Sequence, residues 1–503
     1  MRKRFAIAGW TVALAGAAQA QTIDSAALKQ VATVDTRFQS YNVEMVEVTG
    51  GRFWKPYRLG PPKDAEDRYA YRPPIDLANP RLVKLARALG PAYVRVSGTW
   101  ANTTYFADTD TPPTAAPEGF SAVLTREQWR GVARFVRAVD GKLVTSFAGS
   151  AGVRDKNGIW RPDQMRALAA FSEKIGMPIA AAEFLNEPNL IAATGAPAGY
   201  IAADYGRDWD RFVVAFRKAA PGALVLGPGS VGDGGSVEAL AAAAGLKLLP
   251  SRDLLAASRE RVDAFSYHHY GGLSQRCATS GPLALAPSTA LDPAWLARTD
   301  AAFALYRSLR DKHAPGAPIW LTETGQAACG GSPWAATWAD APRYIDQLGR
   351  LAKAGVQTVM HNTLAASDYA LLDDESFAPR PSYWAALLWS RLMGNKVLEV
   401  ESPSPTLRLY AHCMKNKSGG VALAAINLSA AATQVRFIGK GKSYVLAGTD
   451  ENRSATLNGT LLALGHNDAL PEMNGQSVDG SAAVAASGIT FIALPGARAP
   501  ACR

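Results

Sequence analysis

The stretch TREQWRGVARFVRAVDGKLVTSF, residues 125–147, contains a helix pattern followed by a buried-strand pattern. Thr125 and Gln128 form a capping-box pair, which is typical of the first turn of a helix. Apolar side chains then recur at spacings of three and four residues, at Trp129, Val132, Phe135, Val136 and Val139. The run Leu143–Phe147 is short and largely apolar, as expected of a strand covered on both faces. This unit predicts a sheet with helices packed against it.

The same alternation of strand and helix patterns extends from about residue 36 to residue 395. Eight apolar runs have strand length, at Phe38–Val46, Ala92–Val96, Leu143–Phe147, Ile179–Phe184, Ala223–Leu226, Val262–Tyr267, Pro318–Thr322 and Gln357–His361. Helix patterns lie between them, at Thr125–Val139, Pro162–Ile175, Asp208–Ala219, Trp295–His313, Asp340–Ala354 and Ser382–Met393. Eight strands alternating with helices predict an α/β fold, a (β/α)8 TIM barrel over residues 36–395. A doubly wound open sheet is the alternative.

Beyond residue 395 the pattern changes to short strands separated by turn residues. The candidates are Leu407–His412, Val421–Asn427, Gln434–Phe437, Ser443–Leu446, Leu461–Leu464 and Ile489–Leu494. They predict a C-terminal β-sandwich domain over residues 396–503. Thr22–Thr33 is expected to add a strand to it, so residues 21–35 join the sandwich. Ala101–Gly119, rich in Thr, Asp and Pro, is expected to be a surface loop.

Residues 1–20 have the pattern of a secretory signal peptide. A basic start, Met1–Arg4, precedes a short apolar run, and Ala18-Gln19-Ala20 has the small-x-small form of a cleavage site. A membrane anchor is the alternative, but the apolar run is too short to span a bilayer. We therefore expect an exported protein, periplasmic or secreted, with no membrane association.

The composition is that of a globular chain, with 48% hydrophobic and 19% charged residues, which excludes a disordered chain, a collagen and a coiled coil. The formal net charge is +10. Positive charge suits a polyanionic partner because it steers such a molecule toward the protein, although solubility alone is another explanation. Beyond the signal we find no lysine/arginine run or nucleic-acid motif, so no nucleic-acid partner is expected.

Four cysteines occur, at positions 277, 329, 413 and 502. An even number in an exported chain suggests two disulfides, and the sequence alone allows three pairings. Free buried thiols are the alternative. No C-x-x-C spacing is present, so a four-cysteine zinc site is not expected.

Two glutamates follow the fourth and seventh predicted strands. Glu187 lies in the segment FLNEPN, residues 184–189, and Glu323 lies in WLTETG, residues 320–325. In a (β/α)8 barrel the catalytic groups gather at the carboxyl ends of the strands, so both side chains should point into the mouth. Paired carboxylates across a cleft are what glycosidic bond hydrolysis needs, since one donates a proton and the other attacks or activates water. The alternative for each is a structural carboxylate bonded to a neighbouring loop.

Polar residues beside these glutamates are candidates for substrate contacts. Asn186 offers a donor for a sugar hydroxyl, although it could instead close an Asx-turn. His268 and His269 are adjacent on a strand and point to opposite faces, so they cannot chelate one metal ion, and no metal site is expected. His268 and Tyr270 share a face and are expected to line the mouth. The other histidine of the pair is expected to pack in the barrel wall.

A glycine-rich stretch, GPGSVG at residues 227–232, fits the pattern G-x-G-x-x-G. It follows the fifth strand rather than opening a βαβ unit, and Pro228 removes a backbone donor from the would-be phosphate site. We therefore expect a glycine-rich barrel loop beside the cleft and no cofactor.

Longer motifs resemble one family. Asn186-Glu187-Pro188 together with Glu323 is similar to the retaining glycoside hydrolases of clan A. LLDDESF at 371–377, PSYW at 381–384, and WLTET at 320–324 followed by CGG at 329–331 resemble the heparanases of glycoside hydrolase family 79. YAHC at 410–413, with Cys502, is similar to the sandwich disulfide of that family. The resemblance covers most of residues 22–503 and indicates a bacterial member of the family.

The resemblance implies a role for individual residues. It makes Glu187 the acid/base and Glu323 the nucleophile. It also implies substrate contacts by Asn186, Glu44, Thr99, Tyr270, Gly330, Gly331 and Tyr369. Among these, Glu44 stands where the family has an aspartate. The two glycines, through backbone N–H groups, and Tyr369 would hold the carboxylate of a glucuronic acid.

Two departures from the family are visible, and they bear on the substrate and on processing. The stretch 229–236 has no lysine or arginine where the mammalian member has a basic cluster, so contacts to substrate sulfates must differ or be fewer. The long excised linker of that member is missing, which implies a single unprocessed chain. The resemblance pairs Cys413 with Cys502. A Cys277–Cys329 bond would join neighbouring barrel loops and hold Gly330 and Gly331 still.

The function implied is a retaining endo-β-glucuronidase that cleaves internal β-linked glucuronic acid bonds in heparan sulfate by double displacement, as a monomer without cofactors. One alternative is an exo-β-glucuronidase of the same family, which acts on terminal glucuronate. Another is a clan relative that acts on neutral xylosides or glucosides. An alternative of another class is a non-catalytic carbohydrate-binding protein on a hydrolase fold.

Overall fold

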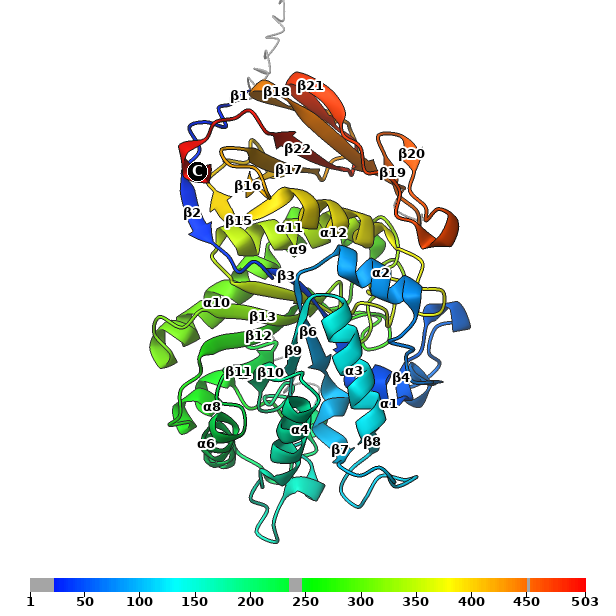
Figure 1. Ribbon diagram of the computed structural model, residues 1–503, viewed down its shortest axis with the longest axis vertical. Helices are drawn as coiled ribbons and strands as arrows, with labels where there is room; N and C mark the ends of the chain where they lie inside the picture. The colour runs from blue at the N-terminus through cyan, green and yellow to red at the C-terminus, as the bar shows by residue number, and fades with distance from the viewer. Residues whose placement is uncertain (1–21, 235–246, 450–452) are drawn as a thin grey trace, which may run out of the picture.

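The structure is a computed structural model that describes residues 22–234, 247–449 and 453–503. The predicted signal peptide, residues 1–20, lies outside the described residues. Within the described ranges no helix is both long and apolar enough to cross a membrane. The chain forms a lower barrel and an upper β-sheet domain, with helices between them (Figure 1).

Eight parallel strands close into a barrel, which confirms the predicted fold and excludes the open sheet. In order around the barrel they are β3 (Gln39–Glu44), β6 (Ala92–Ser97), β9 (Gly141–Thr145), β10 (Ile179–Glu183), β11 (Leu224–Val231), β12 (Ala264–Tyr270), β13 (Ile319–Gly325) and β14 (Thr358–His361), which pairs with β3. Each contains part of one of the eight predicted runs. Seven of the strands contribute to a separate buried cluster that fills the barrel, made of Tyr93, Val144, Ala181, Leu226, Ala264, Trp320 and Met360.

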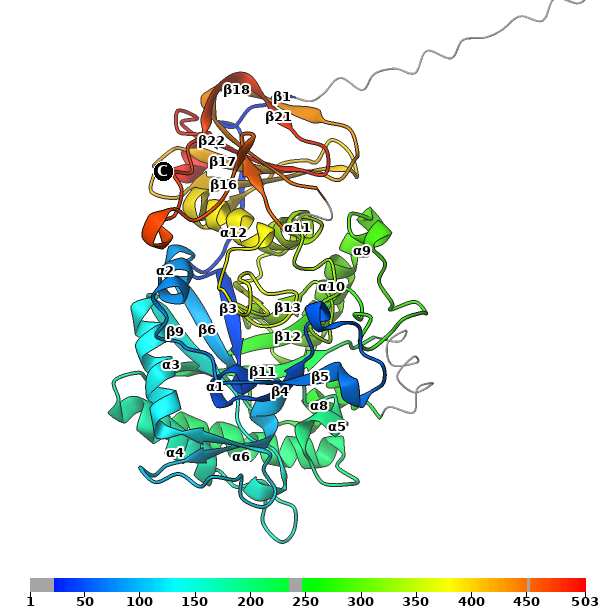
Figure 2. The same cartoon turned by 90° about the vertical axis from the view of Figure 1, so that its right-hand side faces the viewer.

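Helices cover the outside of the barrel (Figures 1 and 2). They are α1 (Met45–Thr49), α2 (Pro80–Ala88), α3 (Arg126–Ala138), α4 (Asp163–Lys174), α5 (Ile191–Thr194), α6 (Ala202–Ala219), α8 (Ser251–Ala257), α9 (Pro293–Leu296), α10 (Arg298–His313), α11 (Asp340–Lys353) and α12 (Pro381–Leu392). The predicted capping box of α3 is present. The Thr125 hydroxyl accepts from the Gln128 N–H at 3.1 Å, and the Gln128 side chain accepts from the Thr125 N–H at 2.8 Å.

The second domain is a ten-stranded sheet system in the order β2-β15-β16-β17-β22-β18-β19-β20, with β1 and β21 also paired to β18. The strands are β1 (Thr22–Ile23), β2 (Gln30–Thr33), β15 (Met393–Leu398), β16 (Leu407–Met414), β17 (Val421–Asn427), β18 (Thr433–Ala447), β19 (Thr456–Leu457), β20 (Thr460–Leu461), β21 (Gln476–Val484) and β22 (Ile489–Leu494). This arrangement agrees with the predicted β-sandwich. The N-terminal strands β1 and β2 join it, as expected.

Several predicted segments differ from the structure. The runs 434–437 and 443–446 are one strand, β18, because a shift in pairing near Gly439 lets the chain bend without ending the strand. Ala101–Gly119 is not only a loop, since it contains β7 (Thr104–Ala107), which pairs with β8 (Ala122–Thr125). The stretch GPGSVG is mostly strand, because β11 continues to Val231. The first barrel strand ends at Glu44, where α1 begins.

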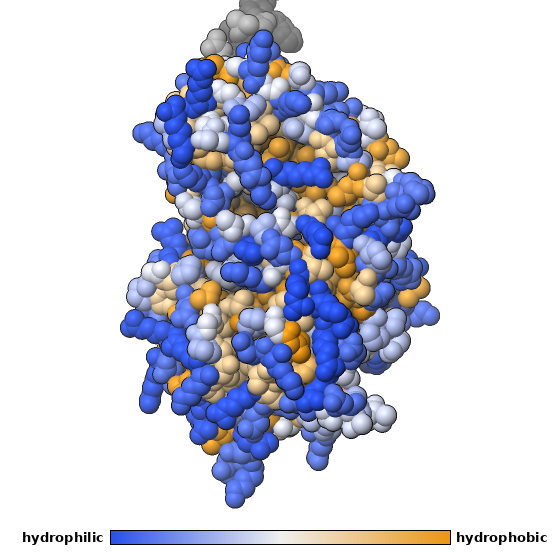
Figure 3. Space-filling model, viewed as in Figure 1, coloured by the Kyte–Doolittle hydropathy of each residue, from blue (hydrophilic) through white to orange (hydrophobic). Residues whose placement is uncertain are grey.

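The two domains meet where the sheet packs on α11 and α12 (Figures 1 and 2). The Tyr410 ring of β16 covers Gly349 of α11, and a Cβ added to this glycine would lie 2.3 Å from the ring. The Tyr410 hydroxyl donates to Asp346 at 2.6 Å. In contrast to this buried contact, the face of the molecule seen in Figure 3 is covered largely by hydrophilic residues, with hydrophobic ones in patches between them.

We expect Gly349→Ala to lower the free energy of unfolding by about 1–3 kcal/mol, the usual cost of overpacking. Gly131→Ala in α3 is the matched control, because its added Cβ would approach only Arg134, at 3.9 Å. Gly131→Ala should raise the free energy of unfolding by about 0.5–1 kcal/mol, because alanine has a higher helix propensity than glycine. Thermal unfolding, monitored by circular dichroism, measures the stability of both variants. If Gly349→Ala and Gly131→Ala changed the stability equally, the packing of Tyr410 on Gly349 would be contradicted.

Candidate active site

The two predicted glutamates lie together at the carboxyl ends of the barrel strands. Glu323 belongs to β13, and Glu187 follows the end of β10 by four residues. Glu187 has a positive φ of 51°, which is uncommon for a residue other than glycine, and its N–H donates to the carbonyl of Gly229 on β11. The two residues are 7% and 6% exposed. The fold therefore places both carboxyl groups in a nearly enclosed space.

His268 of β12 lies between the two carboxyl groups. Its Nδ1 is 3.1 Å from Glu187 Oε1 and 3.7 Å from Glu323 Oε2. One oxygen of each glutamate and one nitrogen of His268 all lie within 4.8 Å of one another. Burial alone would lower the pKa of His268, but the charge of Glu323 and hydrogen bonds to Glu183 and Glu187 raise it to about 9. This shift favours the positively charged imidazole.

Arg95 of β6 is the second cation of the site. It donates from Nε and Nη2 to Glu183 Oε2 at 3.0 and 2.8 Å, and from Nη1 to Glu323 Oε2 at 2.9 Å. A further bond joins its Nη2 to Asn186 Oδ1 at 2.7 Å. Burial would raise the pKa of Glu183, but Arg95 and His268 hold it well below its usual range. Arg95 thus orients the nucleophile candidate and Asn186 at once.

Glu187 and Glu323 have different surroundings. Burial, together with the charge of Glu323, raises the pKa of Glu187 above the usual carboxyl range, although the hydrogen bond from His268 opposes the shift. Glu323 accepts hydrogen bonds on both oxygens, from Arg95 and from the Tyr270 hydroxyl at 2.8 Å. His268 and Tyr270 share a face, as predicted, and both bond to the carboxyl groups. His269 faces the other way, and burial with nearby Arg343 lowers its pKa to about 4.

Asn362, which follows β14, connects the remaining polar side chains. Its Nδ2 lies within hydrogen-bond distance of Glu44 Oε1 at 2.9 Å, of the Tyr369 hydroxyl at 2.9 Å and of the Tyr270 hydroxyl at 3.1 Å. Burial and the nearby charge of Glu323 raise the pKa of Glu44 well above its usual value, which favours the neutral form. Glu44 sits against Gly98, where a Cβ would lie 1.5 Å from its Oε2, so only glycine fits there.

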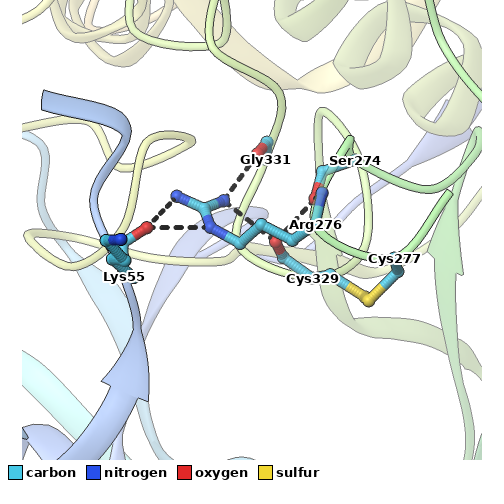
Figure 4. Close-up of a disulfide and its surroundings, with 6 residues drawn as sticks. All are labelled: Lys55, Ser274, Arg276, Cys277, Cys329 and Gly331. Atoms are coloured by element: carbon cyan, nitrogen blue, oxygen red, sulfur yellow. Dashed lines mark hydrogen bonds between the residues drawn. A yellow bond between two sulfur atoms is a disulfide. The ribbon is translucent and has the colours of Figure 1, made fainter. Parts of the chain in front are cut away.

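The loop after Glu323 is held by a disulfide and by a buried arginine (Figure 4). Cys277 is bonded to Cys329, and Arg276 donates to the carbonyls of Cys329 at 3.0 Å and Gly331 at 2.8 Å. Arg276 also donates twice to the carbonyl of Lys55, at 2.9 and 2.7 Å, and forms an ion pair with Asp368, next to Tyr369. One guanidinium therefore joins three loops at the mouth.

The two glycines of this loop differ in what they can offer a ligand. The Gly331 N–H donates to the Ala327 carbonyl at 3.1 Å, so it is used within the loop. The Gly330 N–H has no acceptor among the described residues. Thr99 begins the short helix η3 (Thr99–Thr103), directly after Gly98, and is half-buried. The other disulfide joins Cys413 and Cys502, so both pairings expected from the sequence are present.

Several residues of the site were not singled out from the sequence, among them Arg95, Glu183, Asn102, Asn362 and Arg276. Arg95 and Glu183 are charged positions inside predicted buried strands, and that conflict is a signal that could have found them. Asn102 holds Asn186 by exchanging two hydrogen bonds of 2.9 Å with its backbone. It lies in the stretch that was expected to be a loop. Asn362 has no sequence signal beyond following a strand.

The chain is similar in sequence to several known proteins. No protein-family model matches it. It is 28% identical over 401 residues to heparanase-like protein 1 of Arabidopsis thaliana, which covers 76% of this chain and 70% of that protein. It is 26% identical over 494 residues to heparanase of Mus musculus, covering 85% and 88%. Over 193 residues, 36% of each chain, it is 32% identical to baicalin-β-D-glucuronidase of Scutellaria baicalensis.

Solved structures share the fold. A 4-O-α-L-rhamnosyl-β-D-glucuronidase of Fusarium oxysporum matches with a TM-score of 0.63 at 13% identity, covering 92% of this chain and 97% of that one. An arabinofuranosidase matches with a TM-score of 0.63 at 13% identity, covering 94% and 99%. The barrel, the paired carboxylates and the relatives define the chain as a glycoside hydrolase. More narrowly, its homologues over most of the chain are heparanases and heparanase-like proteins.

We expect Arg95→Met to destabilise the protein by about 3–5 kcal/mol, because it removes the cation that bonds to both Glu183 and Glu323 and leaves only His268 beside these buried carboxylates. Adding Glu183→Gln should recover part of this loss, since the unpaired charge is then gone. Arg134→Met, which removes the exposed partner of Glu127, is the control and should change little. Thermal unfolding of the wild type and these three variants tests this, and a double variant no more stable than Arg95→Met would contradict it.

Proposed function

We propose that the protein is a retaining endo-β-glucuronidase that cleaves internal β-linked glucuronic acid bonds in heparan sulfate. The observation that carries this is the distance between the two carboxyl groups, which approach within 4.8 Å. Retaining glycosidases have carboxyl groups about 5–5.5 Å apart, whereas inverting enzymes leave about 6.5–9.5 Å for a water molecule. The short distance favours double displacement.

In this mechanism Glu323 is the nucleophile and Glu187 is the acid/base. An oxygen of Glu323 forms a bond to the anomeric carbon while the bond to the leaving oxygen breaks, and Glu187 gives its proton to that oxygen. Glu187 then takes a proton from water, which attacks the same carbon and releases Glu323. The raised pKa of Glu187 suits the first step, because a general acid must hold its proton near the working pH.

Buried polar atoms without protein partners indicate where a sugar would bind. Asn186 Nδ2 and Glu44 Oε2 are both buried and have no hydrogen-bond partner within the part of the chain that the structure describes. Buried polar atoms are normally paired, so a hydroxyl-bearing ligand is a natural partner. Asn186, whose Oδ1 is already taken by Arg95, would donate to the hydroxyl beside the anomeric carbon. The free Gly330 N–H and Tyr369 would hold the glucuronate carboxylate, with Thr99 nearby.

The substrate class rests on the relatives and on charge. Heparanases and a β-D-glucuronidase are among the similar proteins, and the net positive charge, which remains after loss of Arg2, Lys3 and Arg4 with the predicted signal peptide, suits a polyanionic glycosaminoglycan. Two disulfides agree with an extracellular protein, so we propose that the chain is exported. A second candidate, exo-β-glucuronidase action, is favoured by the near enclosure of Glu187 and Glu323.

Incubation of heparan sulfate with the protein, followed by sizing of the chains, tests the function. We expect chain shortening, and none with Glu323→Gln, whose turnover should fall by about 10³-fold or more, because covalent catalysis is lost. Glu127→Gln, on the surface of α3, is the matched control. Free glucuronic acid with little shortening would instead support the exo-enzyme. An inverted anomeric configuration in the first product, observed by proton NMR, would contradict double displacement.

The pH dependence tests the acid/base assignment. Glu187 must be protonated to act, so kcat/KM should fall as pH rises through its raised pKa. His268→Gln removes a positive charge that lowers the pKa of Glu187, so the falling limb should move to higher pH. His313→Gln, on α10, should leave the limb in place. A limb that stays fixed or moves to lower pH in His268→Gln would argue against Glu187 as the acid.

A further inference from the structure

A two-stranded hairpin lies over the loop that follows Glu323. It consists of β4 (Gly51–Trp54) and β5 (Tyr69–Arg72) and belongs to the segment between α1 and α2 (Figure 2). A Cβ added to Gly330 would lie 2.8 Å from Trp54, so this side chain packs directly on the loop. The carbonyl of Lys55, the next residue, is held by Arg276 (Figure 4). The hairpin is therefore fixed at the mouth of the site.

Three aromatic rings gather at this point. Trp54 and Tyr69 face each other in the hairpin register, and their rings stack with centroids 4.9 Å apart. Trp100, which follows Thr99, lies edge-on to both, at 6.0 Å from Trp54 and 6.4 Å from Tyr69. We call Trp54, Tyr69 and Trp100 the aromatic platform. Two chain segments that flank the candidate active site thus contribute to one cluster.

The platform is not ordinary core. Trp54 and Trp100 pack on a buried cluster of Val46, Phe53 and Ala366, in which Phe53 is 2% exposed and its ring centroid lies 4.8 Å from that of Trp100. All three platform residues are nevertheless only half-buried, so part of each ring remains open to solvent. The indole N–H groups of Trp54 and Trp100 have no acceptor among the described residues. Half-exposed rings with free donors can accept the apolar face of a sugar while bonding to its hydroxyls.

Positive charge near the aromatic platform favours an anionic sugar as its ligand. Residues 51–72 contain six lysines and arginines but three acidic residues, although acidic residues outside the segment pair with Arg58 and Arg72. Arg52 lies on the same strand face as Trp54, and its side chain is 53% exposed even though it pairs with Glu66. A ring that stacks here would place carboxylate or sulfate groups near positive charge, which favours anionic sugars.

We propose that the aromatic platform is a subsite for a second pyranose ring of an anionic glycan, next to the ring that is cleaved. The inference rests on the proposed function and deepens it. A subsite of this kind contributes binding energy only when the substrate is a chain. It would therefore make the enzyme prefer oligosaccharides to single glucuronides.

The experiment compares two substrates in each variant, a heparan sulfate oligosaccharide and nitrophenyl β-glucuronide. We expect Trp100→Leu and Tyr69→Leu to lower the ratio of kcat/KM for the oligosaccharide to that for the dye by about ten-fold or more. Trp100→Phe, which keeps a ring, should restore most of the ratio. Tyr444→Leu, in strand β18 of the sandwich, is the control and should keep the wild-type ratio. An unchanged ratio in Trp100→Leu overturns the proposal.

A binding measurement separates this inference from the enzymatic proposal. The same oligosaccharide is titrated into the Glu323→Gln protein while tryptophan fluorescence is followed. We expect an emission change that is lost, with at least ten-fold weaker binding, when Trp100→Leu is added. If binding depends on Trp100 but the wild-type protein does not cleave the oligosaccharide, the aromatic platform is supported and the proposed endo-β-glucuronidase activity is rejected. Equal affinity with and without Trp100→Leu would overturn the platform, whatever the turnover.

Discussion

The site depends on how two cations balance four buried glutamates. Glu44, Glu183, Glu187 and Glu323 converge at one end of the barrel, and Arg95 and His268 are the positive groups that touch them. Four ionised carboxylates would leave an excess of buried negative charge, which is costly. Burial is the largest cause of the raised pKa values of Glu44 and Glu187, and Glu187 is raised even though His268 bonds to it. The proton of the acid is therefore favoured because burial and the charge of Glu323 outweigh the opposing effect of His268 and Arg95.

The barrel could be predicted because its strands are buried on both faces, which gives each one a continuous apolar run. Glu187 and Glu323 could be predicted because each follows such a run, where barrel strands open into the mouth. Arg95 and Glu183 are charged residues within the same apolar runs. A pattern of apolar residues identifies the strands but does not indicate that these two side chains pair. Their importance follows from a contact between β6 and β10, 88 residues apart, which no local pattern encodes.

Segments with weaker apolar character were harder to predict. β15 and β21 include polar and small residues such as Asn395 and Asp479, because one side of each strand reaches solvent. β18 was divided in two because Gly439 and its neighbours look like a turn, whereas the paired strand β21 accommodates the bend. Asn102 and Asn362 lie outside the barrel strands and act through side-chain hydrogen bonds to residues far away in the sequence. Tertiary packing sets the position of such residues, so no local sequence pattern predicts it.

The sandwich domain contributes to the site indirectly. The chain leaves Glu323, passes the loop held by Arg276, and reaches Trp338 before α11 begins. Trp338 is fully buried, and its indole N–H donates to the carbonyl of Ser487 in the sandwich at 2.7 Å. Tyr410 then holds α11 through Asp346. The segment that carries the nucleophile candidate is thus fixed by the barrel strand at its start and by the sandwich at its end. Loss of the sandwich should therefore disturb Gly330 and Gly331 before it disturbs the barrel strands.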